Sequence, residues 1–180
     1  RNYEDWVRTD EHPLMSPQIF PKKVFQLDNG DKLFFILIDN FRLDQWRSVK
    51  PLLTDIFNIE EELYTSILPT ATQYARNAIF SGLMPLDIEK LFPDLWVDEE
   101  SEEGKNLNES PLIDTMFKRY RRSCRFSYNK INDSHGAERL LREFGKLEQN
   151  DLNVLVVNFI DMLSHARTES KMIRELASTN

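Results

Sequence analysis

Apolar runs of strand length divide the chain. Residues 32–38 (KLFFILI) and 152–159 (LNVLVVNF) are apolar along most of their length, which is typical of strands buried on both faces of a parallel sheet. A shorter run, LYTSIL at 63–68, predicts another strand of this kind, and RFSYNKI at 125–131 predicts a short one. The pattern therefore predicts a sheet of at least three well-buried strands.

Segments with helical signals lie between these runs. Ser16-Pro17 suits a helix start, and Gly82 suits the end of a helix that begins near Thr72. Helices are predicted over the following ranges: 14–29, 43–57, 72–81, 85–91, 111–122, 133–147 and 166–178. Strands that alternate with helices predict an α/β fold with a largely parallel sheet flanked by helices.

The remaining segments are polar. Residues 1–13 predict a linker from a preceding domain, with Tyr3 and Trp6 as candidate anchors, and the acidic stretch 97–110 predicts a solvated loop. The rest of the 180 residues suits a single domain with a sizeable core.

Charge and composition exclude several classes of protein. The net charge of −7 argues against a protein that coats nucleic acid, although a bound divalent metal would still allow phosphate binding. The single cysteine, Cys124, excludes an internal disulfide and favours a reducing compartment. No apolar run approaches the ~20 residues that span a bilayer, and the charged start is unlike a signal peptide. We therefore expect a cytoplasmic protein with no membrane partner.

Polar residues follow the three strongest strand predictions. Asp39 follows the first, Thr70 and Thr72 follow the second, and Asp161 with His165 follows the third. Each has an ordinary interpretation, since Asp39 or Thr72 could cap a helix and Asp161 could pair with His165 at helical spacing. Their coincidence favours a site, because parallel sheets bind ligands outside the carboxyl ends of their strands.

These residue types suit phosphoryl chemistry. Carboxylate and imidazole groups are ligands that zinc accepts, and metal coordination activates a hydroxyl such as that of Thr72 for attack. The start of the following helix offers backbone N–H groups to phosphoryl oxygens. A guanidinium could hold the same charge in a bidentate manner, and the candidates are Arg42, Arg76 and Arg167.

Three stretches resemble a known family. PTATQYARNAIFSGLMP at 69–85 resembles the nucleophile segment of the alkaline phosphatase superfamily, with Thr72 as the nucleophile. IDNFRLDQW at 38–46 and NFIDMLSHARTE at 158–169 are similar to the PglZ branch, in particular to PglZ domains of PorX-like response regulators of bacterial type IX secretion.

The resemblance implies a site and an activity. It implies two zinc ions, one served by Asp39 and Thr72 and the other by Asp161 and His165. It further implies phosphodiesterase or phosphomonoesterase activity, with a phosphoester or nucleotide as substrate, in the effector domain of a two-component system.

One departure separates the chain from that pattern. The superfamily completes its metal sites with a later Asp-His-Gly motif and a further His, whereas DSHGAERL has Ser134 before His135 and predicts a helix start. We therefore expect residues 14–180 to be the N-terminal part of an incomplete domain that binds zinc weakly and is nearly inactive. The alternative is a non-catalytic module that docks a transcription or secretion regulator. An open sheet edge would favour association, including a homodimer.

Overall fold

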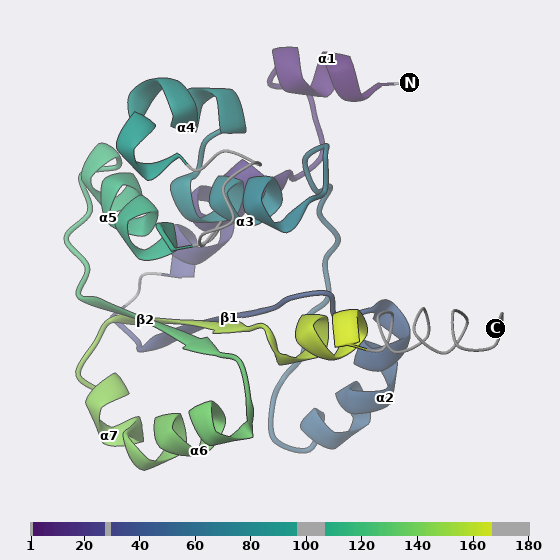
Figure 1. Cartoon of the computed structure of the whole chain (residues 1–180), viewed down its shortest axis with the longest axis vertical. Coiled ribbons are helices and arrows are strands. Elements are labelled where there is room, and N and C mark those ends of the chain that lie inside the picture. Colours follow the sequence, from purple (N-terminus) through teal and green to yellow (C-terminus); the bar gives the residue numbers. More distant parts are fainter. Residues whose placement is uncertain (1, 28–29, 97–106, 167–180) are drawn as a thin grey trace, which may run out of the picture. The chain divides into compact units, whose positions relative to one another are not determined.

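The structure is a computed structural model that describes residues 2–27, 30–96 and 107–166 (Figure 1). The chain forms two compact units, each built from two separate segments. The helical unit comprises Arg1–Asp31 and Glu61–Cys124, and the sheet unit comprises Lys32–Glu60 and Arg125–Asn180. Each unit is described by itself.

The helical unit contains four α-helices among its described residues. These are α1 (Tyr3–Arg8), α3 (Thr72–Ser81), α4 (Pro85–Leu91) and α5 (Glu109–Arg119). Shorter turns complete it: η1 (Ser16–Gln18), η2 (Phe20–Val24), η3 (Phe25–Leu27) and η4 (Pro93–Leu95). Its core is apolar and includes Phe20, Phe80, Ile88, Leu112 and Met116. The Phe20 and Phe80 rings meet edge to face, with centroids 6.1 Å apart.

Three predictions for this unit need correction. The helix predicted at 14–29 is instead the run of short turns η1, η2 and η3, because Pro17 and Pro21 provide no N–H for continuous helical bonding. The strand predicted at 63–68 is absent from the described structure, where Thr65 forms only an isolated bridge with Met15. Helix α5 begins and ends slightly earlier than the predicted range 111–122. By contrast, the predicted bounds 72–81 and 85–91 are confirmed.

The N-terminal residues are part of this unit. Part of the stretch predicted as a linker, Tyr3–Arg8, forms helix α1. Tyr3 and Trp6 pack against a buried cluster made by Met15, Ile67 and Ala78. The anchoring role of the two aromatic residues is therefore confirmed.

The acidic stretch predicted as a loop, residues 97–110, falls largely outside the described residues.

The sheet unit has a three-stranded parallel sheet with the order β1-β3-β2. Its elements are β1 (Leu33–Ile38), α2 (Leu43–Leu53), β2 (Phe126–Ile131), α6 (Ser134–Arg142), α7 (Phe144–Leu147) and β3 (Leu152–Val157). Residues 159–166 after β3 are helical. The predicted α/β class with a parallel sheet flanked by helices is confirmed.

Burial differs between the strands according to their position. The central strand β3 is buried at all but its last residue, as predicted. Strand β1 lies at an edge of the described sheet, and its side chains alternate between half-buried and exposed, with Phe34, Ile36 and Ile38 exposed. The prediction that β1 is buried on both faces is therefore wrong, because successive side chains of a strand point to opposite faces and those on one face are exposed.

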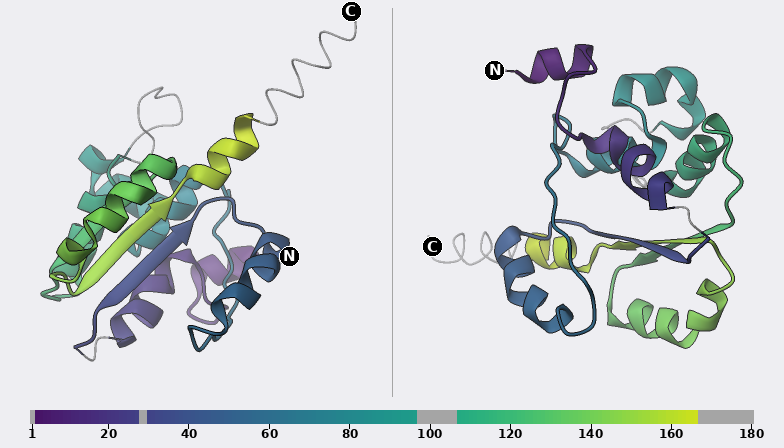
Figure 2. Two further views of the ribbon diagram at one scale, coloured as in Figure 1. Left: turned by 90° about the horizontal axis from the view of Figure 1, so that it is seen from below. Right: turned by 180° about the vertical axis from the view of Figure 1, so that it is seen from behind.

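Helices α6 and α7 pack on one face of this sheet (Figure 2). The Phe144 ring of α7 stacks on Phe34 of β1, with centroids 5.7 Å apart. The Asn153 side-chain amide of β3 donates to the Leu147 carbonyl at 3.0 Å. These contacts hold α7 against the amino-terminal ends of β1 and β3.

Three further boundaries differ from the predictions. Helix α2 ends at Leu53 rather than at residue 57, with Pro51 in its last turn. The helix predicted at 133–147 is divided into α6 and α7, which Glu143 separates. Most of the helix predicted at 166–178 lies outside the described residues. None of the described helices combines the length and apolar character needed to cross a bilayer.

Candidate functional site

Thr72 is the first residue of helix α3. Ala71 is the N-cap, and no side chain caps the helix start. The Ala71 carbonyl accepts hydrogen bonds from the N–H groups of Tyr74 and Ala75, at 2.9 and 3.0 Å. Thr72 is half-buried and Thr70 is exposed. The ordinary interpretation of Thr72 as an N-cap is therefore wrong, and its hydroxyl is not used to close the helix.

The segment that leads to Thr72 is held by residues distant in sequence. The Ser16 hydroxyl accepts the N–H of Ile67 at 3.2 Å, and the Tyr3 hydroxyl accepts the N–H of Leu68 at 2.6 Å. Because Ile67 is fully buried, these bonds fix the chain just before the helix. The position of Thr72 therefore depends on the first sixteen residues.

Helix α3 is tied to α5 at both ends. Near its start, the Arg76 guanidinium makes two 2.7 Å hydrogen bonds to the Glu109 carboxylate. At its end, Arg119 donates to the Ser81 carbonyl, and burial lowers the pKa of Arg119. Gly82 then ends the helix in the left-handed conformation, with φ of +65°.

Arg76 is buried, and its guanidinium is paired with the Glu109 carboxylate. The predicted role of Arg76 in binding a phosphoryl group competes with this ion pair, because Glu109 already balances the charge of Arg76 inside the protein. On the same helix, Gln73 Nε2 and Asn77 Oδ1 are buried without a hydrogen-bond partner among the described residues. Helix α3 thus carries a polar buried face beside its half-buried threonine.

Asp39 follows strand β1 directly. Its N–H donates to the Val157 carbonyl of β3 at 3.0 Å, which extends the parallel pairing by one residue. The carboxylate is half-buried. Because β1 and β3 are parallel neighbours, Asp39 and the segment after β3 leave the sheet at the same edge.

Asp161 and His165 lie on the helical segment 159–166 that follows β3. His165 Nε2 is 3.4 Å from Asp161 Oδ2, with the imidazole exposed and the carboxylate half-buried. Within the described residues, no group of three or more His, Cys, Asp or Glu side chains is placed to hold a metal ion. The pair offers one nitrogen and one carboxylate.

The two other arginine candidates for phosphate binding are Arg42 and Arg167. Arg42 is the exposed N-cap of α2 and binds Asp44 through two hydrogen bonds of 2.9 and 2.8 Å. Its hydrogen bond to Asp44 raises the pKa of Arg42 and lowers the pKa of Asp44. Arg167 lies outside the described residues.

The structure brings only some of the predicted residues to one sheet edge. Asp39 and Asp161 follow the neighbouring strands β1 and β3 of the sheet unit. Thr72 belongs to the helical unit, and it follows no strand of this sheet. The prediction that all three strong strand ends share one edge therefore fails for the second run. A common site for the four residues stays a prediction.

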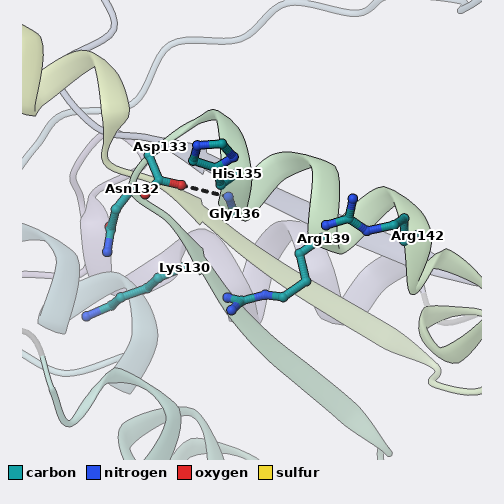
Figure 3. Close-up of a pocket in the computed structure, with 7 residues that line it drawn as sticks. All are labelled: Lys130, Asn132, Asp133, His135, Gly136, Arg139 and Arg142. Carbon is teal, nitrogen blue, oxygen red and sulfur yellow. Dashed lines mark hydrogen bonds between the residues drawn. The ribbon is translucent and has the colours of Figure 1, made fainter.

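Sequence reasoning missed two polar features. Glu109, the buried partner of Arg76, lies in a segment predicted as solvated loop. The stretch KINDSHGAERLLR, at 130–142, lines a cavity beside the start of α6 (Figure 3). The signal in the sequence that could have indicated this cavity is the helical spacing of the basic residues Arg139 and Arg142.

Comparison with known proteins gives one result. A family model described as "BREX system PglZ alkaline phosphatase-like domain" matches residues 19–180. A search of curated proteins finds no match to the chain.

Proposed function

The chain belongs to the PglZ family of alkaline phosphatase-like domains, and we propose that it serves a zinc-dependent phosphoesterase in which Thr72 is the nucleophile. The family match supports a phosphoesterase type of fold. The identity of the nucleophile, the metal and the substrate class is our proposal and goes beyond the family match.

The observation that carries the proposal is the state of Thr72. Its side chain is half-buried at the first position of α3 and forms no capping hydrogen bond. The first turn of a helix presents N–H groups that favour a phosphoryl anion. A threonine hydroxyl placed there can reach a phosphorus atom while the helix start holds the phosphoryl oxygens.

The side chains of the sheet unit fit zinc in type. Asp161 and His165 present a carboxylate oxygen and an imidazole nitrogen 3.4 Å apart, and Asp39 adds a carboxylate at the same sheet edge. Two or three such ligands are fewer than the four of structural zinc sites. A tight site therefore needs ligands in addition to these, which agrees with the weak binding expected of this chain.

The chain's own groups divide the work as follows. Thr72 Oγ1 would attack phosphorus and displace the alcohol of the ester, and water would then hydrolyse the phosphothreonine. Zinc held by the candidate ligands would lower the pKa of the Thr72 hydroxyl. Arg42 is exposed and could turn from Asp44 to a phosphoryl oxygen at small cost, since surface ion pairs are weak. Arg167 keeps the same proposed role. We leave Arg76 out because its bidentate pair with Glu109 is buried.

The biological setting is also a proposal. The similarity of residues 38–46 and 158–169 to PorX-like response regulators supports an effector domain with nucleotide substrates, in the cytoplasm. The matching family model carries a description from the BREX system, which leaves that setting untested.

A non-catalytic binding module is the second candidate. Apolar side chains are exposed on strand β1, at the end of α2 and in the residues that follow α2, among them Ile36, Leu52, Ile56 and Phe57. Exposed apolar groups in this number suit a docking surface for a protein partner. A transcription or secretion regulator, or a second copy of the chain, would cover them.

Two measurements test the proposal. The first compares the intact mass of the purified protein with its zinc content by elemental analysis. The second follows hydrolysis of bis(4-nitrophenyl) phosphate by the complete protein as its host cell makes it. We expect Thr72→Ala to lose activity by more than about a hundredfold, whereas the matched variant Thr70→Ala retains it. Equal activity of the two variants would reject Thr72 as the nucleophile and favour the binding module.

A further inference from the structure

A cavity in the sheet unit lies beside the first turns of α6, at the carboxyl end of β2 (Figure 3). Its volume is about 320 Å³, and its lining includes Lys130, Asn132, Asp133, His135, Arg139 and Arg142. That volume is at the lower end of the range for small-molecule sites. The carboxyl end of a parallel strand is also the usual place for a ligand.

The charge of this cavity is strongly positive. Lys130, Arg139 and Arg142 carry three permanent positive charges in a protein whose net charge is −7. In the described part of the chain, no carboxylate forms an ion pair with Arg139 or Arg142. Like charges that share a cavity repel one another, and an anionic ligand would relieve that repulsion.

The one carboxylate in the lining is already engaged. Asp133 Oδ1 accepts the Gly136 N–H at 2.7 Å and thereby caps α6. A Cβ at position 136 would lie 3.3 Å from the same oxygen, so the glycine allows this close cap. The Asp133 carboxylate therefore stabilises the start of α6, and it offsets little of the positive charge of Arg139 and Arg142 further along the helix.

The donors come from separate elements. Lys130 extends from the end of β2, whereas Arg139 extends from α6, and Figure 3 shows their nitrogen-bearing ends on the same side of the helix as the Asn132 side chain. Asn132 Oδ1 accepts from Asn158 Nδ2 at 2.9 Å. That bond orients the Asn132 amide and leaves its NH₂ group as a donor.

We propose that this cavity binds a small molecule that bears a diphosphate or triphosphate group. Guanidinium groups match phosphate oxygens in a bidentate geometry, and a lysine adds a point charge. Three cations suit more than one phosphate. Arg139 and Lys130 hold the phosphate chain, and Arg142, one helical turn beyond Arg139, supplies the second guanidinium. The site requires neither zinc nor Thr72.

Isothermal titration calorimetry with inorganic pyrophosphate tests this proposal. The 180-residue chain is first stripped of metal with a chelator and exchanged into metal-free buffer of low ionic strength. We expect one pyrophosphate per chain, with affinity that falls as salt is added. Arg139→Gln should weaken binding by about tenfold or more, since a charge-assisted bidentate contact is lost. Arg47→Gln, an exposed position on α2, is the matched control with the same change in charge and should bind as the wild type does.

Backbone NMR gives a second measurement that does not depend on a variant. Pyrophosphate should shift the amide signals of Gly136 and Arg139 more than those of α2. The proposal is overturned if pyrophosphate does not bind, if Arg139→Gln and Lys130→Gln both bind like the wild type, or if citrate binds equally well. Because the protein is free of metal, these results are separate from the success or failure of Thr72 as a nucleophile.

Discussion

The Arg76 guanidinium and the Glu109 carboxylate face each other in the helical unit, with two nitrogen–oxygen distances of 2.7 Å. Both side chains are buried, and Glu109 is fully so. Arg76 is on α3 and Glu109 is the first residue of α5, so the pair joins the helix that begins with Thr72 to its neighbour. An ion pair of this kind is costly to break from one side, because the remaining charge stays buried without a partner.

We therefore predict that Glu109→Gln lowers the free energy of unfolding by about 3–5 kcal/mol. Urea denaturation followed by circular dichroism measures this change. The double variant Arg76→Met with Glu109→Leu should recover most of the loss, because it removes both charges and keeps the volume.

Asp114→Asn is the control on the same helix. Asp114 pairs with Lys118 at the surface, and exposed pairs contribute under about 1 kcal/mol. A loss from Glu109→Gln no larger than that of the control would contradict the structural role of the buried pair.

This pair also shows where sequence reasoning ends. Arg76 follows the predicted nucleophile by four residues, so a role in holding phosphate was a reasonable inference. Its partner Glu109 is 33 residues away, in a stretch whose acidic composition predicts solvent exposure. Pairing between distant residues depends on tertiary packing, which periodicity does not contain.

Strands β1, β2 and β3 lie where the sequence predicts strands, but uniform burial was predicted correctly only for β3. Residues 152–157 of the run predicted at 152–159 form β3, which has two strand neighbours in the described sheet and is buried as its apolar content predicts, whereas Phe159 lies beyond the strand and is exposed. The run at 32–38 is as apolar, yet β1 has one neighbour and exposes alternate side chains. Composition alone does not distinguish a central strand from an edge strand.

The run at 63–68 misled for a different reason. Ile67 is buried, but Leu63 and Leu68 are exposed, and the backbone pairs only at Thr65. A strand needs a partner along its length, and the local sequence does not report one. The helices at 72–81 and 85–91 were predicted correctly because Gly82 and Pro85 mark their ends locally.

The second prediction compares two helix starts. Asp133 caps α6 through its carboxylate, whereas no side chain caps α3 at Thr72. Asp133→Ala should therefore lower the free energy of unfolding by about 1 kcal/mol, and Thr72→Ala by less than about 0.5 kcal/mol. Thermal unfolding of the two variants measures the difference. A larger loss from Thr72→Ala would show that its hydroxyl has a structural role.

The third prediction concerns the N-terminal segment. The Tyr3 hydroxyl accepts the Leu68 N–H at 2.6 Å, so Tyr3→Phe should lower the free energy of unfolding by about 0.5–1.5 kcal/mol. The same variant should make α1 more sensitive to limited proteolysis, because that bond joins the helix to the segment before Thr72. Tyr120→Phe, at the exposed residue that follows α5, is the control for loss of a phenolic hydroxyl. If Tyr3→Phe changes neither the stability nor the cleavage of the protein, residues 1–13 act as a linker and do not stabilise the helical unit.

Asp151 joins the amino ends of all three described strands. Its Oδ2 accepts the Arg125 N–H at 2.9 Å, just before β2, and its carbonyl accepts the N–H of Leu33 in β1 at 3.0 Å. Its Oδ1 is 3.5 Å from the Lys32 ammonium. The hydrogen bond from Arg125, with a smaller contribution from Lys32, lowers the pKa of Asp151 in the folded protein.

A carboxyl group whose pKa is lower in the folded state stabilises the fold above its unfolded pKa, and the stabilisation is lost as pH falls through the folded pKa. We therefore predict that stability falls between about pH 5 and pH 2 more steeply in the wild type than in Asp151→Asn, which cannot titrate there. Urea denaturation across this range measures the slope. Asp55→Asn, at an exposed position after α2, should keep the wild-type slope. If Asp151→Asn shows the wild-type slope as well, the Arg125 hydrogen bond does not contribute to stability against acid.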